Sequence, residues 1–295
     1  MSGLISALTM WSFEIRNRPL DAIAQTSMRT PNMQTISFNA SGQAIAMLKV
    51  GSGPAVIIIH GLGGHKEDFK SVMTSLAERG LTVYAFDMLG FGGSSRTSPS
   101  VSITAQSEVI KALVDSEKLA QAHLVGNSLG GWVAATFAAK YPEITQSLTL
   151  IDAAGLKATM GGPPPVNFAP DSIADMKALL SVVIASPFAH TDEFAATALA
   201  DFKASGEAAT LGKLFAGFSA PDNKDKLLDD VLPDVKAPTL VVWGARDRLF
   251  PVALADMVAS GVKGARKVIL VNASHFPQID DPVGLSAAIA GFVGS

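Results

Sequence analysis

The feature of this sequence that most constrains its fold is a series of short apolar runs that do not alternate with polar residues. Such runs occur at residues 55–60 (AVIIIH), 82–87 (TVYAFD), 122–126 (AHLVG), 147–152 (SLTLID), 239–244 (TLVVWG) and 267–272 (KVILVN). Strands that are buried on both faces have this composition. Helix-length segments separate most of the runs, among them residues 68–79, 105–118 and 129–140. The sequence therefore predicts an α/β fold, in which helices flank a mostly parallel sheet.

The segment before these runs predicts an antiparallel hairpin. Residues 34–39 and 43–50 flank a turn at residues 40–42 (ASG), which is typical of two neighbouring strands at the edge of a sheet. With these two strands counted, the run at residues 147–152 is the sixth predicted strand.

The alternation of strands and helices stops after the sixth strand. Residues 154–233 begin with a glycine- and proline-rich stretch and continue with helical segments that contain no strand-like run. We interpret this insertion as a helical lid. The sequence then divides into a core, at residues 34–153 and 234–295, with the lid inserted between its two parts.

Residues 1–33 form an N-terminal extension in this division. Leu4, Leu8, Trp11 and Ile15 fall at helical spacing and predict a short amphipathic helix, which we expect to pack on the core; contact with a lipid surface is the alternative. The apolar part has no basic residues before it, so we predict no signal peptide. No apolar stretch elsewhere is long enough to span a membrane, and a cytoplasmic location is the default expectation.

Composition excludes several classes of function. The 295 residues carry a net charge of −3 without a cluster of basic residues, so a nucleic acid is not an expected partner. There are no cysteines, which excludes disulfides and a cysteine nucleophile. The five histidines lie far apart along the chain and no phosphate-binding loop motif occurs, so we predict neither a metal nor a cofactor.

The candidate nucleophile is Ser128. The segment GNSLG at residues 126–130 fits the pattern G-x-S-x-G between a predicted strand and a predicted helix. A serine hydroxyl that attacks a substrate must stand on a sharp turn, and the positions two residues before and after it must have almost no side chain. The alternative interpretation is a serine that caps the following helix.

A serine nucleophile needs a base, and the base needs an orienting acid. His275 is the histidine that follows the last predicted strand closely, at the sheet edge where Ser128 is expected. Asp247, just beyond the preceding strand, is the candidate acid, because it keeps the order Ser, Asp, His along the chain. Asp152 competes with Asp247, and a loop carboxylate paired with a neighbouring arginine is the alternative interpretation of Asp247.

An oxyanion that forms during acyl transfer needs backbone NH groups in fixed positions. The loop HGLGG at residues 60–64 and the start of the helix after Ser128 are the candidate donors. We predict the NH groups of Leu62 and Leu129 as the pair, although Gly63 is close enough to be confused with Leu62. His60 is expected to brace the loop.

These motifs together resemble the α/β-hydrolase superfamily from about residue 34 to the C-terminus, apart from the lid. Two further segments match it: DMLGFGGS at residues 87–94 is similar to the loop D-x-x-G-x-G-x-S, and residues 275–282 are similar to the terminal H-x(4)-[DE]-x-P. The resemblance implies a serine hydrolase that cleaves carboxylic esters through an acyl-enzyme intermediate, like carboxylesterases and lipases. The chain is also similar to the meta-cleavage-product hydrolases, which cut carbon–carbon bonds and hold a substrate carboxylate with a lid arginine. No arginine occurs between Arg96 and Arg246, which favours a small-molecule ester of apolar character.

Two readings from other classes stay open. Residues 55–87 also read as the start of a dinucleotide-binding fold, but Lys66 fills the third glycine position and the motif leaves Ser128 and His275 without a role. A hydrolase fold that is catalytically silent and only binds a ligand is the second alternative.

Overall fold

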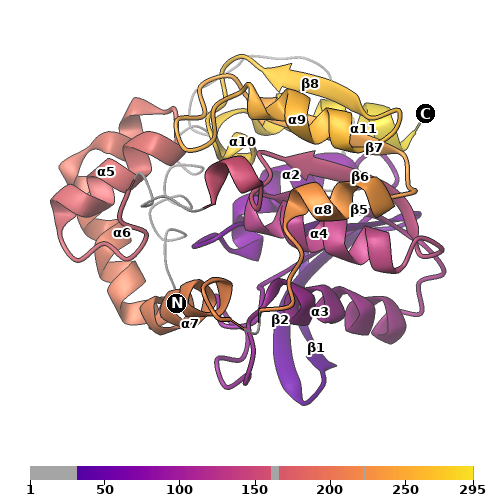
Figure 1. Ribbon diagram of the computed structural model, residues 1–295, viewed down its shortest axis with the longest axis horizontal. Coiled ribbons are helices and arrows are strands. Elements are labelled where there is room, and N and C mark those ends of the chain that lie inside the picture. Colours follow the sequence, from indigo (N-terminus) through magenta and orange to yellow (C-terminus); the bar gives the residue numbers. More distant parts are fainter. Residues whose placement is uncertain (1–31, 161–165, 222, 295) are drawn as a thin grey trace.

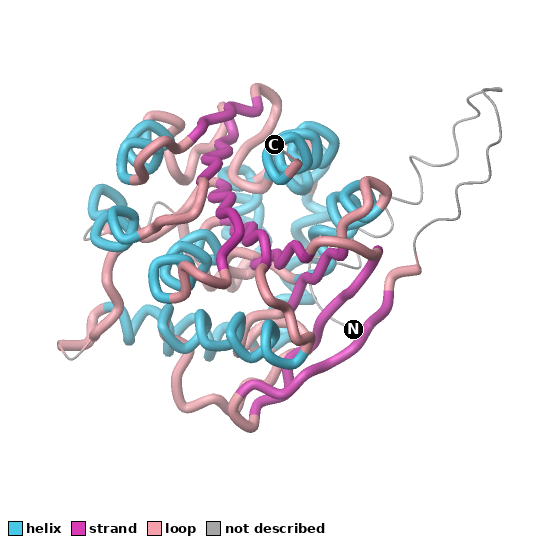
Figure 2. The backbone as a smooth tube through the Cα atoms, turned by 90° about the vertical axis from the view of Figure 1, so that its right-hand side faces the viewer, coloured by secondary structure: helices cyan, strands magenta, loops and turns pink. Residues whose placement is uncertain are grey.

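The computed structural model describes residues 32–160, 166–221 and 223–294. They fold around one eight-stranded, twisted sheet with helices on both faces (Figure 2). The order of the strands across the sheet is β1-β2-β4-β3-β5-β6-β7-β8. The strands are β1 (Gln34–Ala40), β2 (Gln43–Gly51), β3 (Ala55–Ile59), β4 (Thr82–Phe86), β5 (Ala122–Asn127), β6 (Thr145–Ile151), β7 (Thr239–Gly244) and β8 (Arg266–Leu270). Strand β2 is antiparallel to β1 and β4, and all the other pairs are parallel.

The predicted fold class is therefore confirmed, including the antiparallel hairpin at one edge. The turn between β1 and β2 uses Ser41 and Gly42, both with positive φ angles (51° and 83°), which matches the twist of a two-residue hairpin. The first long helix begins two residues earlier than predicted, at Ile103, because the Ser102 side chain accepts a hydrogen bond from the Ala105 NH and caps the helix there.

Alternate residues of the central strands pack into two separate apolar layers. In β3, Ile57 and Ile59 face one layer, whereas Val56 and Ile58 face the other. The first layer is covered by α3 (Ile103–Ser116), α4 (Leu129–Lys140), α8 (Leu228–Val231) and α9 (Leu254–Gly261). The second layer is covered by α2 (Lys70–Ala77) and α11 (Pro282–Val293). Burial on both faces explains why these strands are apolar throughout.

The described residues between β6 and β7 contain no strand. Three helices, α5 (Ile173–Val183), α6 (Asp192–Ser205) and α7 (Glu207–Phe218), lie together to one side of the sheet (Figure 1). Helices α5 and α6 form an apolar cluster of their own, which also includes Leu249 and Phe276 of the core. The short α8 packs into the core instead. The exact division at residues 154 and 233 stays a prediction.

The predicted amphipathic helix lies outside the described residues. Along the part of the chain that the structure describes, no helix has both the length and the apolar run needed to cross a bilayer.

Candidate active site

The candidate nucleophile Ser128 stands in a sharp turn between β5 and α4. Its backbone has φ 54° and ψ −118°, a strained conformation for a residue with a side chain. A Cβ atom at Gly126 would lie 2.2 Å from the Gly130 carbonyl oxygen, and one at Gly130 would lie 2.3 Å from the Ile59 carbonyl oxygen. Both positions therefore require glycine, as the motif predicts.

The Ser128 hydroxyl does not cap the helix that follows it. Ser128 is the N-terminal flanking residue of α4, but its side chain makes no capping hydrogen bond. The turn is held by the backbone instead: the Ser128 NH donates to the Ile151 carbonyl (2.8 Å), and the Ser128 carbonyl accepts from the Ala154 NH (3.0 Å). The hydroxyl is thus left for another task.

His275 and Asp247 are joined directly. The Asp247 Oδ2 atom lies 2.8 Å from His275 Nδ1, and both side chains are almost completely buried. The Asp247 Oδ1 atom accepts hydrogen bonds from the backbone NH groups of Leu249 and Phe250, both at 2.8 Å. With Nδ1 facing the carboxylate, the Nε2 atom of His275 is the nitrogen left for proton transfer.

Asp152, the competing acid, lies in the same place but has a different partner. Its Oδ1 atom accepts a hydrogen bond from the Gly244 NH (2.9 Å), and among the described residues no hydrogen bond joins Asp152 to His275. Complete burial, followed by the charge of Asp247, raises the pKa of Asp152 well above its usual value. The geometry thus pairs the imidazole with Asp247.

Asn127, which precedes the nucleophile, links the sharp turn at Ser128 (the elbow, residues 126–130) to the loop that carries His275. Its Nδ2 atom donates to the His275 carbonyl oxygen (3.1 Å), and its Oδ1 atom accepts from Gln278 Nε2 (3.1 Å). The structure therefore brings the loops of Ser128 and His275 together. Within the described residues, no hydrogen bond joins the Ser128 hydroxyl to the imidazole itself. Strands β5 and β6 end at the same edge of the sheet, where Asn127 pairs with Ile151.

The loop of the predicted oxyanion hole is packed against the elbow. A Cβ atom at Gly61 would lie 3.0 Å from Ser128 Cβ. Of the residues described, neither Leu62 nor Gly63 nor Leu129 uses its backbone NH in a hydrogen bond. These three NH groups are free donors, so the choice between Leu62 and Gly63 stays open.

His60 braces this loop, as expected. Its Nδ1 atom donates to the Gly61 carbonyl (2.7 Å), and its Nε2 atom accepts from the Met88 NH (2.9 Å). Burial lowers the pKa of His60 to about 4, so the ring is neutral at physiological pH. A neutral ring matches a residue that accepts one hydrogen bond and donates another.

Two groups that hold the site were not identified from the sequence. The Asp280 carboxylate accepts from the backbone NH of Ser274, beside the histidine, and from those of Ala185 and Ser186 at the lid. His65, just after the oxyanion loop, pairs with Glu207 of α7 (2.9 Å). The motif H-x(4)-[DE]-x-P contains Asp280 and could have indicated it, whereas nothing local connects His65 with Glu207.

One cluster has the residue types of a metal site. Single ligand atoms of Asp152, Asp247 and His275 lie within 4.8 Å of one another. Both Asp247 oxygens already accept hydrogen bonds from the protein, which is the arrangement of an acid that orients an imidazole. The absence of a metal and of a cofactor stays a prediction.

With this geometry in view, comparison with known proteins identifies the family. Residues 54–282 match the model of the α/β-hydrolase fold, and the chain belongs to that family. Monoacylglycerol lipase ABHD6 of Mus musculus is 28% identical over 272 residues, which cover 83% of this chain and 77% of the relative. The resemblance predicted from the sequence is therefore confirmed.

Solved structures agree with this assignment. The structure of a bacterial membrane phospholipase A matches with a TM-score of 0.75 at 25% identity. The match covers 99% of this chain and 91% of the phospholipase chain. The 2-hydroxy-6-oxo-6-phenylhexa-2,4-dienoate hydrolase from Rhodococcus sp. strain RHA1 matches with a TM-score of 0.78 at 21% identity. This match covers 90% of this chain and 100% of the Rhodococcus chain. The second likeness shows the fold alone.

Proposed function

We propose that the protein is a serine hydrolase that cleaves carboxylic esters of apolar character through an acyl-enzyme intermediate. The observation that carries this proposal is the buried hydrogen bond between Asp247 and His275, on a loop tied to the strained turn that presents Ser128. Acyl transfer by serine needs this combination of a serine hydroxyl on a sharp turn, a base and an orienting acid.

In the proposed reaction, Ser128 Oγ attacks the carbonyl carbon of the ester while His275 Nε2 accepts the hydroxyl proton. The negative charge moves to the carbonyl oxygen, where the Leu62 and Leu129 NH groups stabilise it. His275 then donates the proton to the leaving alkoxide oxygen, and the alcohol departs. Water, deprotonated by the same imidazole, attacks the acyl-enzyme, and the acid and Ser128 are released.

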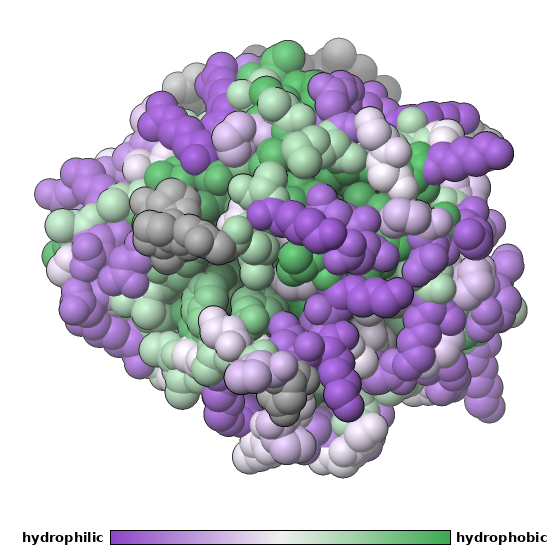
Figure 3. Space-filling view, in the orientation of Figure 1, coloured by the Kyte–Doolittle hydropathy of each residue, from purple (hydrophilic) through white to green (hydrophobic). Residues whose placement is uncertain are grey.

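The surroundings of His275 support an apolar substrate. The Phe250 ring meets the imidazole edge to face, with centroids 5.1 Å apart, and Phe276 lies next to it. Apolar residues also reach the surface between the lid helices and the core (Figure 3). The names of two relatives, a monoacylglycerol lipase and a membrane phospholipase A, agree with a lipid-like ester.

The experiment is hydrolysis of p-nitrophenyl esters with acyl chains of two to twelve carbons, by the wild type and by Ser128→Ala. We expect the variant to lose at least about a thousandfold in kcat, because it has no nucleophile. Ser260→Ala is the matched control, because among the described residues this exposed hydroxyl on α9 forms a hydrogen bond only with the Asp256 carbonyl, and its loss should leave the rate unchanged.

Equal rates for the wild type and Ser128→Ala would refute the proposal. Turnover of a dienol keto acid without turnover of esters would favour the carbon–carbon hydrolase. Tight binding of a ligand without any turnover would favour a silent binding fold. The cytoplasmic location stays a prediction, which fractionation of cells would test.

A further inference from the structure

Asp152 is a completely buried carboxyl group that the proposed reaction does not use. It follows β6 directly, and its backbone has a positive φ angle of 45°. Its NH donates to the Val242 carbonyl (3.0 Å), and its Oδ1 atom accepts from the Gly244 NH (2.9 Å). The Oδ2 atom is buried and has no donor anywhere in the described part of the chain. A buried carboxylate oxygen without a donor is costly, so this atom needs an explanation.

The explanation lies in the neighbouring carboxyl group. Single oxygens of Asp152 and Asp247 lie within 4.8 Å of each other and of a His275 nitrogen, and all three side chains are buried. Two buried carboxylates at this separation repel each other, which favours a proton on one of them, and that proton can then be donated to the other. Asp247 accepts three hydrogen bonds from other groups, whereas Asp152 accepts one. Asp247 is therefore the better place for the negative charge, and Asp152 for the proton.

We propose that Asp152 is a positioning residue: a neutral carboxylic acid that donates a hydrogen bond to Asp247 and so holds the Asp247 carboxylate against His275. This inference rests on the proposed function, because it assigns Asp247 as the acid that orients the base. It also resolves the competition between the two aspartates, since each has a different task in one hydrogen-bonded chain.

The charges around Asp152 agree with this assignment. Burial, the charge of Asp247 in the loop after β7 and that of Asp280 in α10 (Pro277–Asp280) all raise the pKa of Asp152. The Gly244 NH acts in the opposite direction and is outweighed. His275, in the loop after β8, also faces the cluster and is bonded to Asp247. In this assignment the single negative charge lies on Asp247, between the protonated Asp152 and the base His275.

The first test compares Asp152→Ala with Asp152→Asn. The alanine variant removes the donor to Asp247, and we expect kcat to fall about tenfold with little change in KM. Asparagine has the same shape, tolerates a positive φ angle, and can donate from its amide to Asp247 while its oxygen accepts from Gly244. It should therefore rescue most of the loss that alanine causes.

The pH profile separates this role from that of a second charged acid. If Asp152 is neutral, Asp152→Asn keeps the charge near His275, and the acid limb of kcat/KM stays within about 0.3 pH units of wild type. If Asp152 is ionised, the same change removes a buried negative charge, and the acid limb moves to lower pH by more than about one unit. Failure of the rescue, or such a shift, would overturn the proposal.

Thermal unfolding tests whether Asp152 is protonated, and this measurement does not depend on catalytic activity. A carboxyl group with a raised pKa keeps its proton in the folded chain while the unfolded chain releases it above about pH 4. Stability of the wild type relative to Asp152→Asn should therefore fall as the pH rises from 4 to 7. We expect the Tm advantage of the asparagine variant to grow over this range, and a constant or shrinking difference would contradict the proposal. An inert wild type would refute the hydrolase function alone and leave this readout intact.

Discussion

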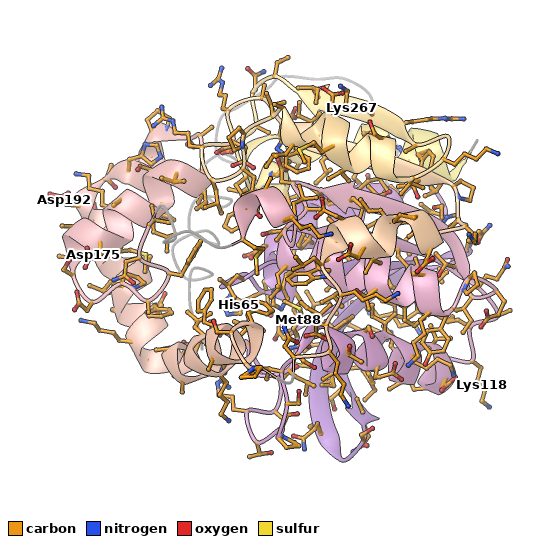
Figure 4. The ribbon with its side chains drawn as sticks, in the orientation of Figure 1. His65, Met88, Lys118, Asp175, Asp192 and Lys267 are labelled. Atoms are coloured by element: carbon orange, nitrogen blue, oxygen red, sulfur yellow. The ribbon has the colours of Figure 1, made fainter. Side chains whose placement is uncertain are left out.

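Replacing Glu207 with glutamine is expected to remove a pH-dependent part of the stability of the fold. Glu207 is the first residue of α7, and its Oε1 atom lies 2.9 Å from His65 Nε2 and accepts from the Gly92 NH (2.9 Å). The His65 and Glu207 side chains are only 3% and 2% exposed. Figure 4 shows His65 beside the lid helices, at the side of the core that α7 covers.

The pKa of His65 sets the pH range of the effect. Burial on its own would lower it, but the hydrogen bond and charge of Glu207, with Asp68 and Asp87 nearby, raise it from 6.5 to about 9. The folded chain then binds a proton that the unfolded chain releases above pH 6.5. This part of the stability is complete below about pH 6.5 and is lost as the pH rises through 9.

The magnitude follows from the shift. The increase of about 2.5 in the pKa of His65 corresponds to roughly 3.5 kcal/mol, at about 1.4 kcal/mol for each pKa unit. In Glu207→Gln the amide keeps the shape and a weaker hydrogen bond but not the charge. We expect the variant to be less stable than wild type by about 3 kcal/mol at pH 6, and by much less at pH 9.5.

Urea unfolding at pH 6, 7.5 and 9.5 measures this difference. Asp192→Asn is the matched control, because its ion pair with Lys177 is exposed on the lid and should contribute less than about 1 kcal/mol at every pH. Among the described residues, the buried His65 Nδ1 atom has no hydrogen-bond partner, so a neutral ring that donates from Nε2 is the alternative state. A stability difference that stays constant from pH 6 to pH 9.5 would favour the neutral ring and refute the reasoning.

Three further predictions concern the elbow and the reaction. Asp247→Asn should lower kcat on the order of a thousandfold or more in steady-state assays, because the imidazole loses the carboxylate that orients it. Gly126→Ala should reduce the free energy of unfolding by about 3 kcal/mol or more, because the new Cβ atom would lie 2.2 Å from the Gly130 carbonyl oxygen. Gly212→Ala is the control: this position has open space around it, so the substitution should be neutral or stabilising. Dialysis against EDTA should leave esterase activity intact, because no step of the proposed reaction uses a metal; loss of activity that zinc restores would contradict this.

The sequence predicts the sheet well because the residues that indicate each strand lie within the strand itself. Each central strand is apolar on both faces, because helices cover both faces of the sheet. The elbow is equally local: Gly126 and Gly130 are needed by contacts within a few residues of Ser128 or with the adjacent strand. Such features can be identified in a single sequence with no knowledge of distant neighbours.

The contacts that hold the lid could not be predicted in this way. Glu207 and His65 are 142 residues apart, and no pattern around either residue indicates the other. The burial of individual phenylalanines in the lid also depends on packing: Phe194 is buried, whereas Phe188 and Phe215 are 44% and 40% exposed. Whether Leu62 or Gly63 serves the oxyanion is likewise decided by loop geometry, and the assignment of catalytic roles stays a prediction until the variants are measured.

Two of the contacts between the lid and the core lie next to loops that the proposed reaction uses. At one point, Glu207 holds the segment after the oxyanion loop through His65. At the other, Asp280 and the Val183 carbonyl hold the chain on either side of His275, since Asp280 accepts from Ser274 and Val183 accepts from the Phe276 NH. A substrate that displaced the lid at either point would disturb the oxyanion donors or the base. Entry should therefore occur between these two points, along the apolar inner sides of α5 and α6, and substitutions there should alter KM and chain-length preference more than kcat.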